Sequence, residues 1–461
     1  MADAEDTREL VAAVDRATDG RVVIPEDPSY DRLRRVWNAR IDRRPAAIVQ
    51  PTSVDDVVAT IEVTAGTDMP VVARGGGHHV SGSAVLDGGM TLDLAELDAV
   101  TVNPDTTRVT VEGGATWGQV DEATRPHGLA AVGGQDPNIG VAGLTLGGGV
   151  GWLSRAYGLA ADNLVEAEVV TADAEVVTAS ADTNPDLFWG LRGAGGSLGI
   201  VTSFTFELHQ VDRVLAGSLV YPIERASVAL RGYRNLVASS PPTLRPLFGL
   251  FDLPSTSPLA DRVPTTRVAI IIVCAIDPVA DAIPPLDRLR SETEPLVDSV
   301  TERSYHAFQR AGESDPHART GLRSRYLPDL TDDAIEAIAD LGTAVPSAGA
   351  TVFVSPRADA EIAVPTHATA YPHRTPCHHV LIEARWDDPR QDAIHDRWVQ
   401  DGATALADHT TGIGSLNFVD RDEPDAQARR TLGPNLERLE AVKARWDPTD
   451  RFGGHATQRW G

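Results

Sequence analysis

The sequence has 461 residues, 42% of them hydrophobic and 23% charged, which suits two packed domains of ordinary size. Acidic residues outnumber basic ones 66 to 41, so the formal net charge is −25. A nucleic-acid-binding surface needs clustered bases, and this balance argues against a nucleic-acid partner. Lys443 is the only lysine. Because concentrated salt screens the repulsion within such an acidic chain, we expect a halophilic protein.

The single lysine and the 2 cysteines exclude several kinds of site. A P-loop needs a lysine inside its glycine-rich turn, whereas Lys443 lies in a charged segment with a helical pattern. Cys274 and Cys377 are too few for a disulfide framework or a four-cysteine metal site. The N-terminal residues lack a signal-peptide core, and the longest apolar run, 268–276, is too short to span a bilayer. We expect a cytoplasmic protein without a membrane span.

Hydrophobic periodicity predicts a mixture of helices and strands in the first half of the chain. Helical spacing predicts helices at 7–20, at 30–40 and from the N-cap residue Ser53 onward. Alternation predicts strands and hairpins at 45–51, 70–74, 100–111 and 169–177. The strand at 70–74 runs directly into a glycine-rich stretch.

From about residue 212 glycine becomes rarer, and strand-like runs alternate with helical ones. The expected strands are 215–221, 268–276, 351–355 and 380–386. The expected helices are 226–237, 332–341 and 393–408. This alternation favours a smaller α+β domain with an antiparallel sheet. A last helix is expected from 432 to 446, before a loop at Gly453 and Gly454.

Glycine-rich loops occur three times, at 75–82, 133–151 and 193–199. Glycine lets backbone N–H groups approach a pyrophosphate closely, although a single such loop more often just caps a strand. None of the three has the spacing G-x-G-x-x-G, which disfavours a Rossmann-type site. Three loops within one domain favour a bound nucleotide. The G-x-S-x-G pattern at 195–199 resembles a serine-hydrolase elbow, but a strand pattern follows it where the elbow needs a helix.

Histidines form two groups. His78 and His79 follow a strand and the three glycines, and a structural role in a turn is the alternative to a functional one. His373, Cys377, His378 and His379 form a loose cluster whose spacing does not match a metal site well, so a metal enzyme remains an alternative. From residue 378 to 386 the sequence alternates as in a strand, and the even-numbered residues form an apolar set that should pack on helices. The odd-numbered residues would lie on the opposite face. His379 and Glu383 would then face a pocket, which makes them candidate catalytic residues.

Several motifs resemble one family when taken in order. They lie at 74–82, 136–149, 155–163, 184–193 and 199–203, and return at 371–374 and 414–452. The chain resembles the berberine-bridge-enzyme-like branch of the vanillyl-alcohol-oxidase (p-cresol methylhydroxylase-type) FAD-linked oxidoreductases. The resemblance is continuous from about 30 to 211 and weak in the middle of the chain.

The resemblance implies an α+β fold with a two-part FAD-binding domain and a substrate domain whose antiparallel sheet, covered by helices, roofs the isoalloxazine. The implied division is an N-terminal helical segment at 1–40, the FAD-binding domain at 41–211, the substrate domain at 212–411 and a C-terminal segment at 412–461 that returns to the FAD-binding domain. His78 matches the histidine that family members link to the flavin 8α-methyl group. The pyrophosphate-binding turn would also include Arg74, Gly75, Gly76, Gly77 and His79. Further implied FAD contacts are Gly134, Asp136, Ile139, Gly140, Gly143, Gly148, Gly199, Ile200 and Val201.

Three departures from the family pattern bear on function. Asp136 stands where many members carry a second flavin-linking cysteine, so attachment should use His78 alone, as in the 6-hydroxy-D-nicotine-oxidase-like members. Ile139 is bulky at the position that admits or blocks oxygen, which resembles the dehydrogenase-type members. Ser415 replaces the tyrosine of the Tyr-x-Asn motif, which counts against carbohydrate oxidation, while Asn417 is kept as a candidate catalytic residue.

The resemblance implies oxidation of a small organic alcohol or amine by hydride transfer to flavin N5. His379 or Glu383 would act as the base. Electrons would pass to oxygen or, if Ile139 blocks it, to another acceptor. The alternatives are an FAD-binding protein without turnover and a metal-dependent enzyme built on residues 373–379. The sequence leaves the substrate and the oligomeric state open.

Overall fold

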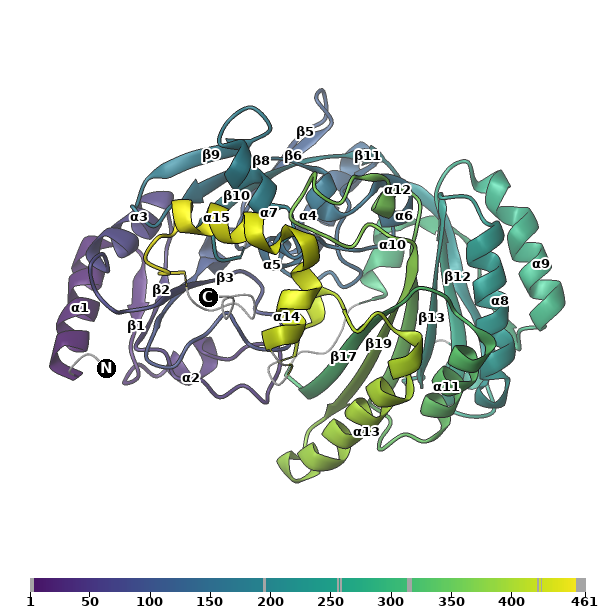
Figure 1. Ribbon diagram of the computed structural model, residues 1–461. Helices are drawn as coiled ribbons and strands as arrows, with labels where there is room; N and C mark the ends of the chain where they lie inside the picture. The colour runs from purple at the N-terminus through teal and green to yellow at the C-terminus, as the bar shows by residue number, and fades with distance from the viewer. Residues whose placement is uncertain are drawn as a thin grey trace.

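The computed structural model describes residues 4–193, 196–254, 257, 259–312, 317–420, 423 and 425–452. It confirms a mixed α and β architecture with three main sheets (Figure 1). No helix in these ranges is long and apolar enough to cross a membrane.

The first sheet has four strands in the order β1-β2-β4-β3. They are β1 (Arg21–Val23), β2 (Ala47–Gln50), β4 (Met90–Asp93) and β3 (Val71–Arg74). β4 pairs in parallel with β2 and β3, and β1 pairs antiparallel with β2. Helices α1 (Ala4–Ala17) and α3 (Val54–Val63) contribute to its hydrophobic core, and α3 begins as expected after Ser53, whose hydroxyl accepts a bond from the backbone N–H of Asp56. The N-terminal segment 1–40 therefore supplies a strand as well as a helix.

The second sheet has five antiparallel strands in the order β5-β6-β10-β8-β9. They are β5 (Val100–Asn103), β6 (Arg108–Glu112), β10 (Ile200–Glu207), β8 (Leu164–Val170) and β9 (Val176–Ser180), which confirms both expected hairpins. Its core includes residues of helices α4 (Trp117–Thr124), α5 (Val141–Leu146), α7 (Pro185–Leu191) and α15 (Leu436–Trp446). The C-terminal part of the chain thus packs beside elements from the first half (Figure 1).

The third sheet is built from residues 213–386. Its main path is β15-β12-β14-β13-β18-β19-β17, and β16 also pairs with β12. The bounds are β12 (Arg213–Pro222), β13 (Leu244–Asp252), β14 (Arg267–Ala275), β15 (Val297–Asp298), β16 (Thr301–Ser304), β17 (Arg319–Leu327), β18 (Ala350–Arg357) and β19 (Cys377–Trp386). Helices α8 (Ala226–Ser239), α9 (Ile283–Thr293), α11 (Asp332–Thr343) and α13 (Asp392–Ala405) cover one face (Figure 1). The antiparallel sheet expected after residue 212 is confirmed.

The two faces of this sheet meet different parts of the molecule. On β19, Val380 and Ile382 belong to the core shared with the covering helices. Leu381 points to the other face, where it packs with Leu322 of β17 and with Val80, which follows the glycine turn after β3. The predicted alternation is therefore confirmed: His379 and Glu383 share the face of Leu381, toward the glycine turn.

Two predicted helices have different bounds in the structure. The prediction of a helix at 30–40 is wrong beyond α2 (Tyr30–Leu33). The backbone N–H groups of Trp37 and Ala39 donate to the distant carbonyls of Gly77 and Ala318 instead of continuing the helix. The last expected helix, at 432–446, begins four residues later as α15, after a short 3-10 turn at Gly433–Asn435. The helix α14 (Asp425–Leu432) before this turn was not predicted. The predicted loop at Gly453 and Gly454 lies outside the described residues.

Candidate active site

The first two glycine loops meet at a backbone contact. A Cβ atom added to Gly76 would lie 2.5 Å from the backbone nitrogen of Gly140, and one added to Gly140 would overlap Gly76 in turn. Only glycine fits at either position, because any side chain would push the two loops apart. Gly75 lies beside them, with its Cβ direction 3.6 Å from Ala142. The structure therefore brings together two of the loops from which the sequence predicts a nucleotide site.

Arg74 and His79 hold this glycine turn in place. Arg74 forms an ion pair of 2.6 Å with Asp93, both side chains being buried, and donates a hydrogen bond to the carbonyl of Leu33. His79 donates from Nε2 to the carbonyl of Leu416, 3.1 Å away, and its Nδ1 lies 2.7 Å from the hydroxyl oxygen of Ser81. Burial lowers the pKa of His79, so the ring is neutral. The polar side-chain atoms of Arg74 and His79, two predicted FAD contacts, thus form their hydrogen bonds within the protein.

His78 lies at a junction of three segments. Its half-buried ring stacks on Trp37, with centroids 5.5 Å apart and planes 26° apart. The guanidinium carbon of Arg385 lies 5.1 Å from the centroid of the same indole. Burial lowers the pKa of His78, Asp136 acts in the opposite direction, and Arg385 lowers the pKa further. His78 and Asp136, predicted from separate loops, are thus close enough to interact.

His379 is buried within a set of polar side chains. Its Nε2 lies 2.8 Å from the Ser324 hydroxyl, and Arg357 donates to its Nδ1 over 3.4 Å. Burial, followed by the charge of Arg357, lowers the pKa of His379 well below its usual range. Both ring nitrogens are therefore used inside the protein, and the ring is neutral.

Glu383 has a different environment on the same face of β19. Its side chain is half-buried, and its register partners are Leu322 of β17 and Thr351 of β18. Among the described residues, none donates a hydrogen bond to its carboxylate. Burial raises the pKa of Glu383, and Arg385 partly offsets that effect. Glu383 is therefore the predicted catalytic residue with an available carboxylate.

A pair of buried tyrosines that was not predicted from the sequence lies next to His379. The hydroxyl oxygens of Tyr326 and Tyr371 lie 3.0 Å apart. Tyr326 faces His379 across the β17–β19 ladder, and Tyr371 lies against the predicted FAD contact Gly148. The family-like stretch 371–374 was a signal for Tyr371. Tyr326 had none, since its strand lies in the weakly similar middle of the chain.

The predicted catalytic residue Asn417 belongs to a segment that crosses from the second sheet to the third. Its side-chain amide donates to the carbonyl of Leu144 in α5, 3.2 Å away. Two residues earlier, the backbone N–H of Ser415 donates to the Ser324 hydroxyl over 2.8 Å. The next residue, Phe418, lies 5.5 Å from His379 between ring centroids. This segment therefore anchors the surroundings of His379 to α5.

The other predicted FAD contacts differ in which of their atoms are buried and which are exposed. The carbonyl of Gly134 accepts a hydrogen bond of 3.0 Å from Gln309, and Ile139 is half-buried beside Gly134. A Cβ atom on Gly143 would meet nothing within 4 Å, so this backbone is open. Gly199 precedes β10, and the side chains of Ile200 and Val201 are buried in hydrophobic cores. The side chains of Ile200 and Val201 therefore serve the protein core.

The geometry does not support the alternative sites. His378 contacts Tyr233 of α8, whereas His379 points to the opposite face of the strand. No group of three histidine, cysteine, aspartate or glutamate side chains suited to a metal exists in the described part of the chain. Ser197 precedes the strand β10 and not a helix, which removes the context of a hydrolase elbow. Gly195 of that pattern lies outside the described residues.

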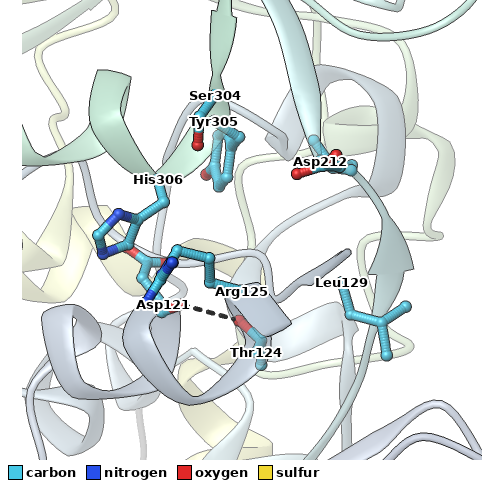
Figure 2. Close-up of a pocket in the computed structure, with 9 residues that line it drawn as sticks. Asp121, Thr124, Arg125, Leu129, Asp212, Ser304, Tyr305 and His306 are labelled. Atoms are coloured by element: carbon cyan, nitrogen blue, oxygen red, sulfur yellow. Dashed lines mark hydrogen bonds between the residues drawn. The ribbon is translucent and has the colours of Figure 1, made fainter. Parts of the chain in front are cut away.

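A small cavity lies where α4 meets the third sheet (Figure 2). Its volume of about 10 Å³ holds about one water molecule, so it is too small for an organic substrate. Asp121, Tyr305 and His306 are among the residues that line it. Burial raises the pKa of Asp121 to about 7.

The residues around the glycine turn fit FAD. The hydroxyl oxygen of Ser83 and the indole nitrogen of Trp37 are buried and have no hydrogen-bond partner within the described ranges. The exposed backbone of Gly143 and the side-chain-free turn at Gly75 and Gly76 leave main-chain groups accessible to a phosphate. Unsatisfied buried donors and open glycine backbone are what a large polar cofactor requires.

Comparison with known proteins agrees with this geometry. A family model described as FAD binding domain matches residues 45–180, and one described as berberine and berberine like matches residues 416–456. The chain thus carries both domains that are typical of the berberine-bridge-enzyme-like FAD-linked oxidoreductases. It is an FAD-linked oxidoreductase, and its cofactor is FAD.

Similar proteins span nearly the whole chain. (R)-6-hydroxynicotine oxidase of Paenarthrobacter nicotinovorans is 29% identical over 94% of this chain and 95% of its own. An uncharacterized FAD-linked oxidoreductase of Bacillus subtilis is also 29% identical, over 94% of this chain and 95% of its own. The crystal structure of 6-hydroxy-D-nicotine oxidase from Arthrobacter nicotinovorans superposes with a TM-score of 0.84 at 26% identity, covering 95% of this chain and 97% of that one. These matches confirm the predicted fold, with an FAD-binding domain of the p-cresol methylhydroxylase type.

Proposed function

We propose that this FAD-linked oxidoreductase oxidises a small organic alcohol or amine, with FAD attached to His78 and Glu383 as the base. The observation that carries the proposal is the junction of the glycine turn with the third sheet, where Val80 packs on Leu381 of β19. His78 stacks on the indole that also contacts Arg385 of β19, and Glu383 lies two residues before Arg385 on the same face. A relative of 29% identity is named as an oxidase of 6-hydroxynicotine, which supports a small organic substrate.

The glycine turn with His78, and the backbone at Gly140 and Gly143, would hold FAD. When bound, FAD supplies an acceptor for a hydride from the substrate carbon. Glu383 takes the proton from the substrate hydroxyl or amine. A base works best when its pKa is near the working pH, and burial moves the pKa of Glu383 in that direction.

His379 has a positioning role in this proposal. Its two ring nitrogens contact Ser324 and Arg357, and its pKa is far below neutral, so it is a poor base. Through Ser324 it is linked to the backbone of Ser415, two residues before Asn417. His379 therefore orients the crossing segment that carries Asn417.

The test is a substrate screen on enzyme purified in molar salt, with bleaching of the yellow flavin as the signal. Exchange of Glu383 for Gln should slow bleaching by about 10²- to 10⁴-fold, the usual contribution of a general base. Glu336→Gln, on the exposed face of α11, is the matched control and should leave the rate unchanged. Equal rates in Glu383→Gln and the native enzyme would contradict the assignment. A protein that keeps FAD but is bleached by no alcohol or amine would support the alternative without turnover.

We also propose that a carrier other than oxygen accepts the electrons. The support is Ile139, a bulky, half-buried side chain directly before Gly140 on the loop that meets the glycine turn. Ile139→Val should raise the rate at which oxygen restores the yellow colour of the bleached enzyme, with little change in the rate with an artificial dye. No gain with oxygen would contradict this assignment.

A further inference from the structure

We propose that Trp37 is a positioning residue for attachment of the flavin, because its stacked indole sets the orientation in which His78 bonds to the 8-methyl carbon of the flavin. This inference rests on the proposed link to His78. It concerns a residue outside every motif from which the sequence predicted the site.

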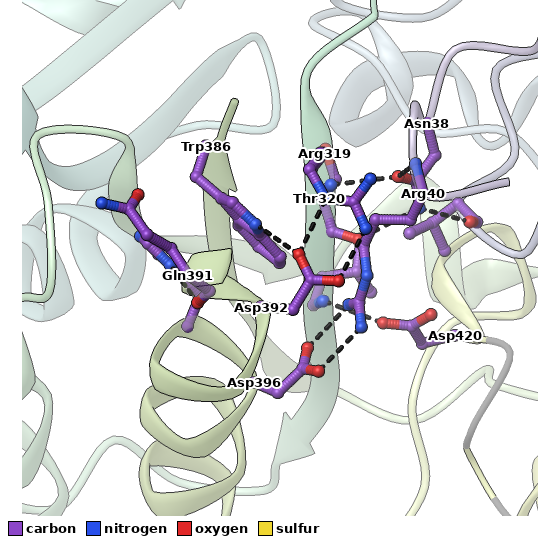
Figure 3. Close-up of polar contacts among 12 residues, drawn as sticks. Asn38, Arg40, Arg319, Thr320, Trp386, Gln391, Asp392, Asp396 and Asp420 are labelled. Atoms are coloured by element: carbon purple, nitrogen blue, oxygen red, sulfur yellow. Dashed lines mark hydrogen bonds and ion pairs between the residues drawn. The ribbon is translucent and has the colours of Figure 1, made fainter. Parts of the chain in front are cut away.

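The backbone around Trp37 is fixed to both sides of His78. The Trp37 N–H donates to the carbonyl of Gly77 over 3.0 Å. The side-chain amide of Asn38 donates to the carbonyl of Val80 over 2.8 Å and to the carbonyl of Thr320 over 3.0 Å. Figure 3 shows Asn38 and Arg40 against Thr320, with Arg40 paired to Asp396 at 2.6 Å. The segment that was expected to be helical is thus attached to the glycine turn and to the third sheet.

The indole ring of Trp37 also contacts two neighbouring side chains. Arg385 of β19 lies over the ring at 5.1 Å, a distance suited to a cation–π contact. The His78 ring stacks on the same indole with planes 26° apart. A ring stacked on a fixed neighbour cannot turn freely about its χ2 bond, so its nitrogen atoms keep one direction. A fixed direction favours bond formation because the reacting atoms are already oriented.

Charges around His78 suit the reaction. The neutral form of imidazole is the nucleophile, and burial lowers the pKa of His78 so that this form dominates. In the overall step a methyl C–H bond and the imidazole N–H bond break and a C–N bond forms. Two electrons and two protons, one proton from each broken bond, leave through the flavin to an artificial dye, which is reduced.

The experiment measures covalent flavin directly and does not depend on turnover. Native enzyme and variants are loaded with FAD in the presence of an artificial dye as electron acceptor. Samples are precipitated with acid at intervals, and the flavin in pellet and supernatant is measured. His78→Ala should keep all flavin in the supernatant. Trp37→Leu should bind FAD but form the pellet fraction at least about tenfold more slowly, as expected when a reacting group loses its orientation. Trp37→Phe should restore most of the rate, because an aromatic ring again stacks on His78.

A further variant separates this role from a structural one. Tyr157→Leu removes another aromatic–histidine stack, that of Tyr157 on His209 at 3.8 Å, and should leave covalent attachment unchanged. The inference would be overturned if Trp37→Leu attached flavin at the native rate, or if Trp37→Phe attached it as slowly as Trp37→Leu. Either result would leave the link to His78 in place. Native enzyme with all its flavin in the supernatant would instead overturn the proposed link itself, and this inference with it.

Discussion

Replacement of Asp121 by Asn should stabilise the protein, and the gain should grow with pH. Asp121 lies on α4 at the small cavity of Figure 2, and its exposed fraction is only 6%. Its one side-chain partner among the described residues is Gln309, which donates to it over 3.3 Å and also to the carbonyl of Gly134. Asn can accept the same bond from Gln309, so the substitution removes the charge with little change in shape.

The size of the effect follows from the pKa of Asp121, which burial raises from 3.8 to about 7. Between these two values the folded protein keeps a proton that the unfolded chain releases, so stability falls as pH rises. Each pKa unit corresponds to about 1.4 kcal/mol, and the shift of about three units gives a cost of about 4 kcal/mol above pH 7. At pH 5 the cost is only about 1.5 kcal/mol.

Urea unfolding of the native enzyme and of Asp121→Asn, at pH 5 and pH 8 in molar salt, tests this reasoning. The difference in free energy of unfolding should be about 2 to 3 kcal/mol larger at pH 8 than at pH 5. Asp212→Asn is the matched control, because Asp212 lines the same cavity but is exposed, and its effect should be small at both values. Equal gains at the two pH values, or no gain at pH 8, would refute the argument.

Three other predictions concern the ion pairs, the glycine turn and the surface charge. Arg374→Ala breaks a buried ion pair with Asp162, whose two hydrogen bonds measure 2.7 and 2.6 Å. In urea titrations the free energy of unfolding should fall by about 3–5 kcal/mol, and a loss below about 1 kcal/mol would contradict this prediction. Gly76→Ala forces the glycine turn away from Gly140. The ratio of FAD to protein, measured by absorbance, should fall below about a tenth of the native ratio. A native ratio would show that the close approach of the two glycines is unnecessary. Transfer from about 2 M to about 0.2 M salt should lower the midpoint temperature of unfolding, because the net charge of −25 is then less screened. A constant midpoint would argue against a halophilic protein.

Patterns that depend on neighbouring residues were readable from the sequence. Alternation along β19 placed His379 and Glu383 on the face away from the helices, since successive side chains of a strand point to opposite sides. Ser53 marked the start of α3 because its hydroxyl bonds within the same turn of chain. The close packing of Gly76 and Gly140 explains why both loops carry glycine, although the contact itself was not foreseen.

Other features came from contacts between distant residues. Residues 34–40 have a helical pattern, yet bonds from Trp37 and Asn38 to the glycine turn and to β17 outweigh that weak local preference. The same contacts place the indole on His78, which no local pattern could indicate.

The chemistry of the candidate base also depended on burial and on partners. His379 and Glu383 were equal candidates in the sequence, and the structure distinguishes them because Ser324 and Arg357 occupy His379 while the carboxylate of Glu383 has no donor among the described residues. The sequence by itself determined the class of enzyme, its cofactor and the alternating faces, because motifs and periodicity are local. Only the tertiary structure decided which side chains meet and in which direction burial shifts their pKa, because pKa and contact depend on groups far apart in the chain.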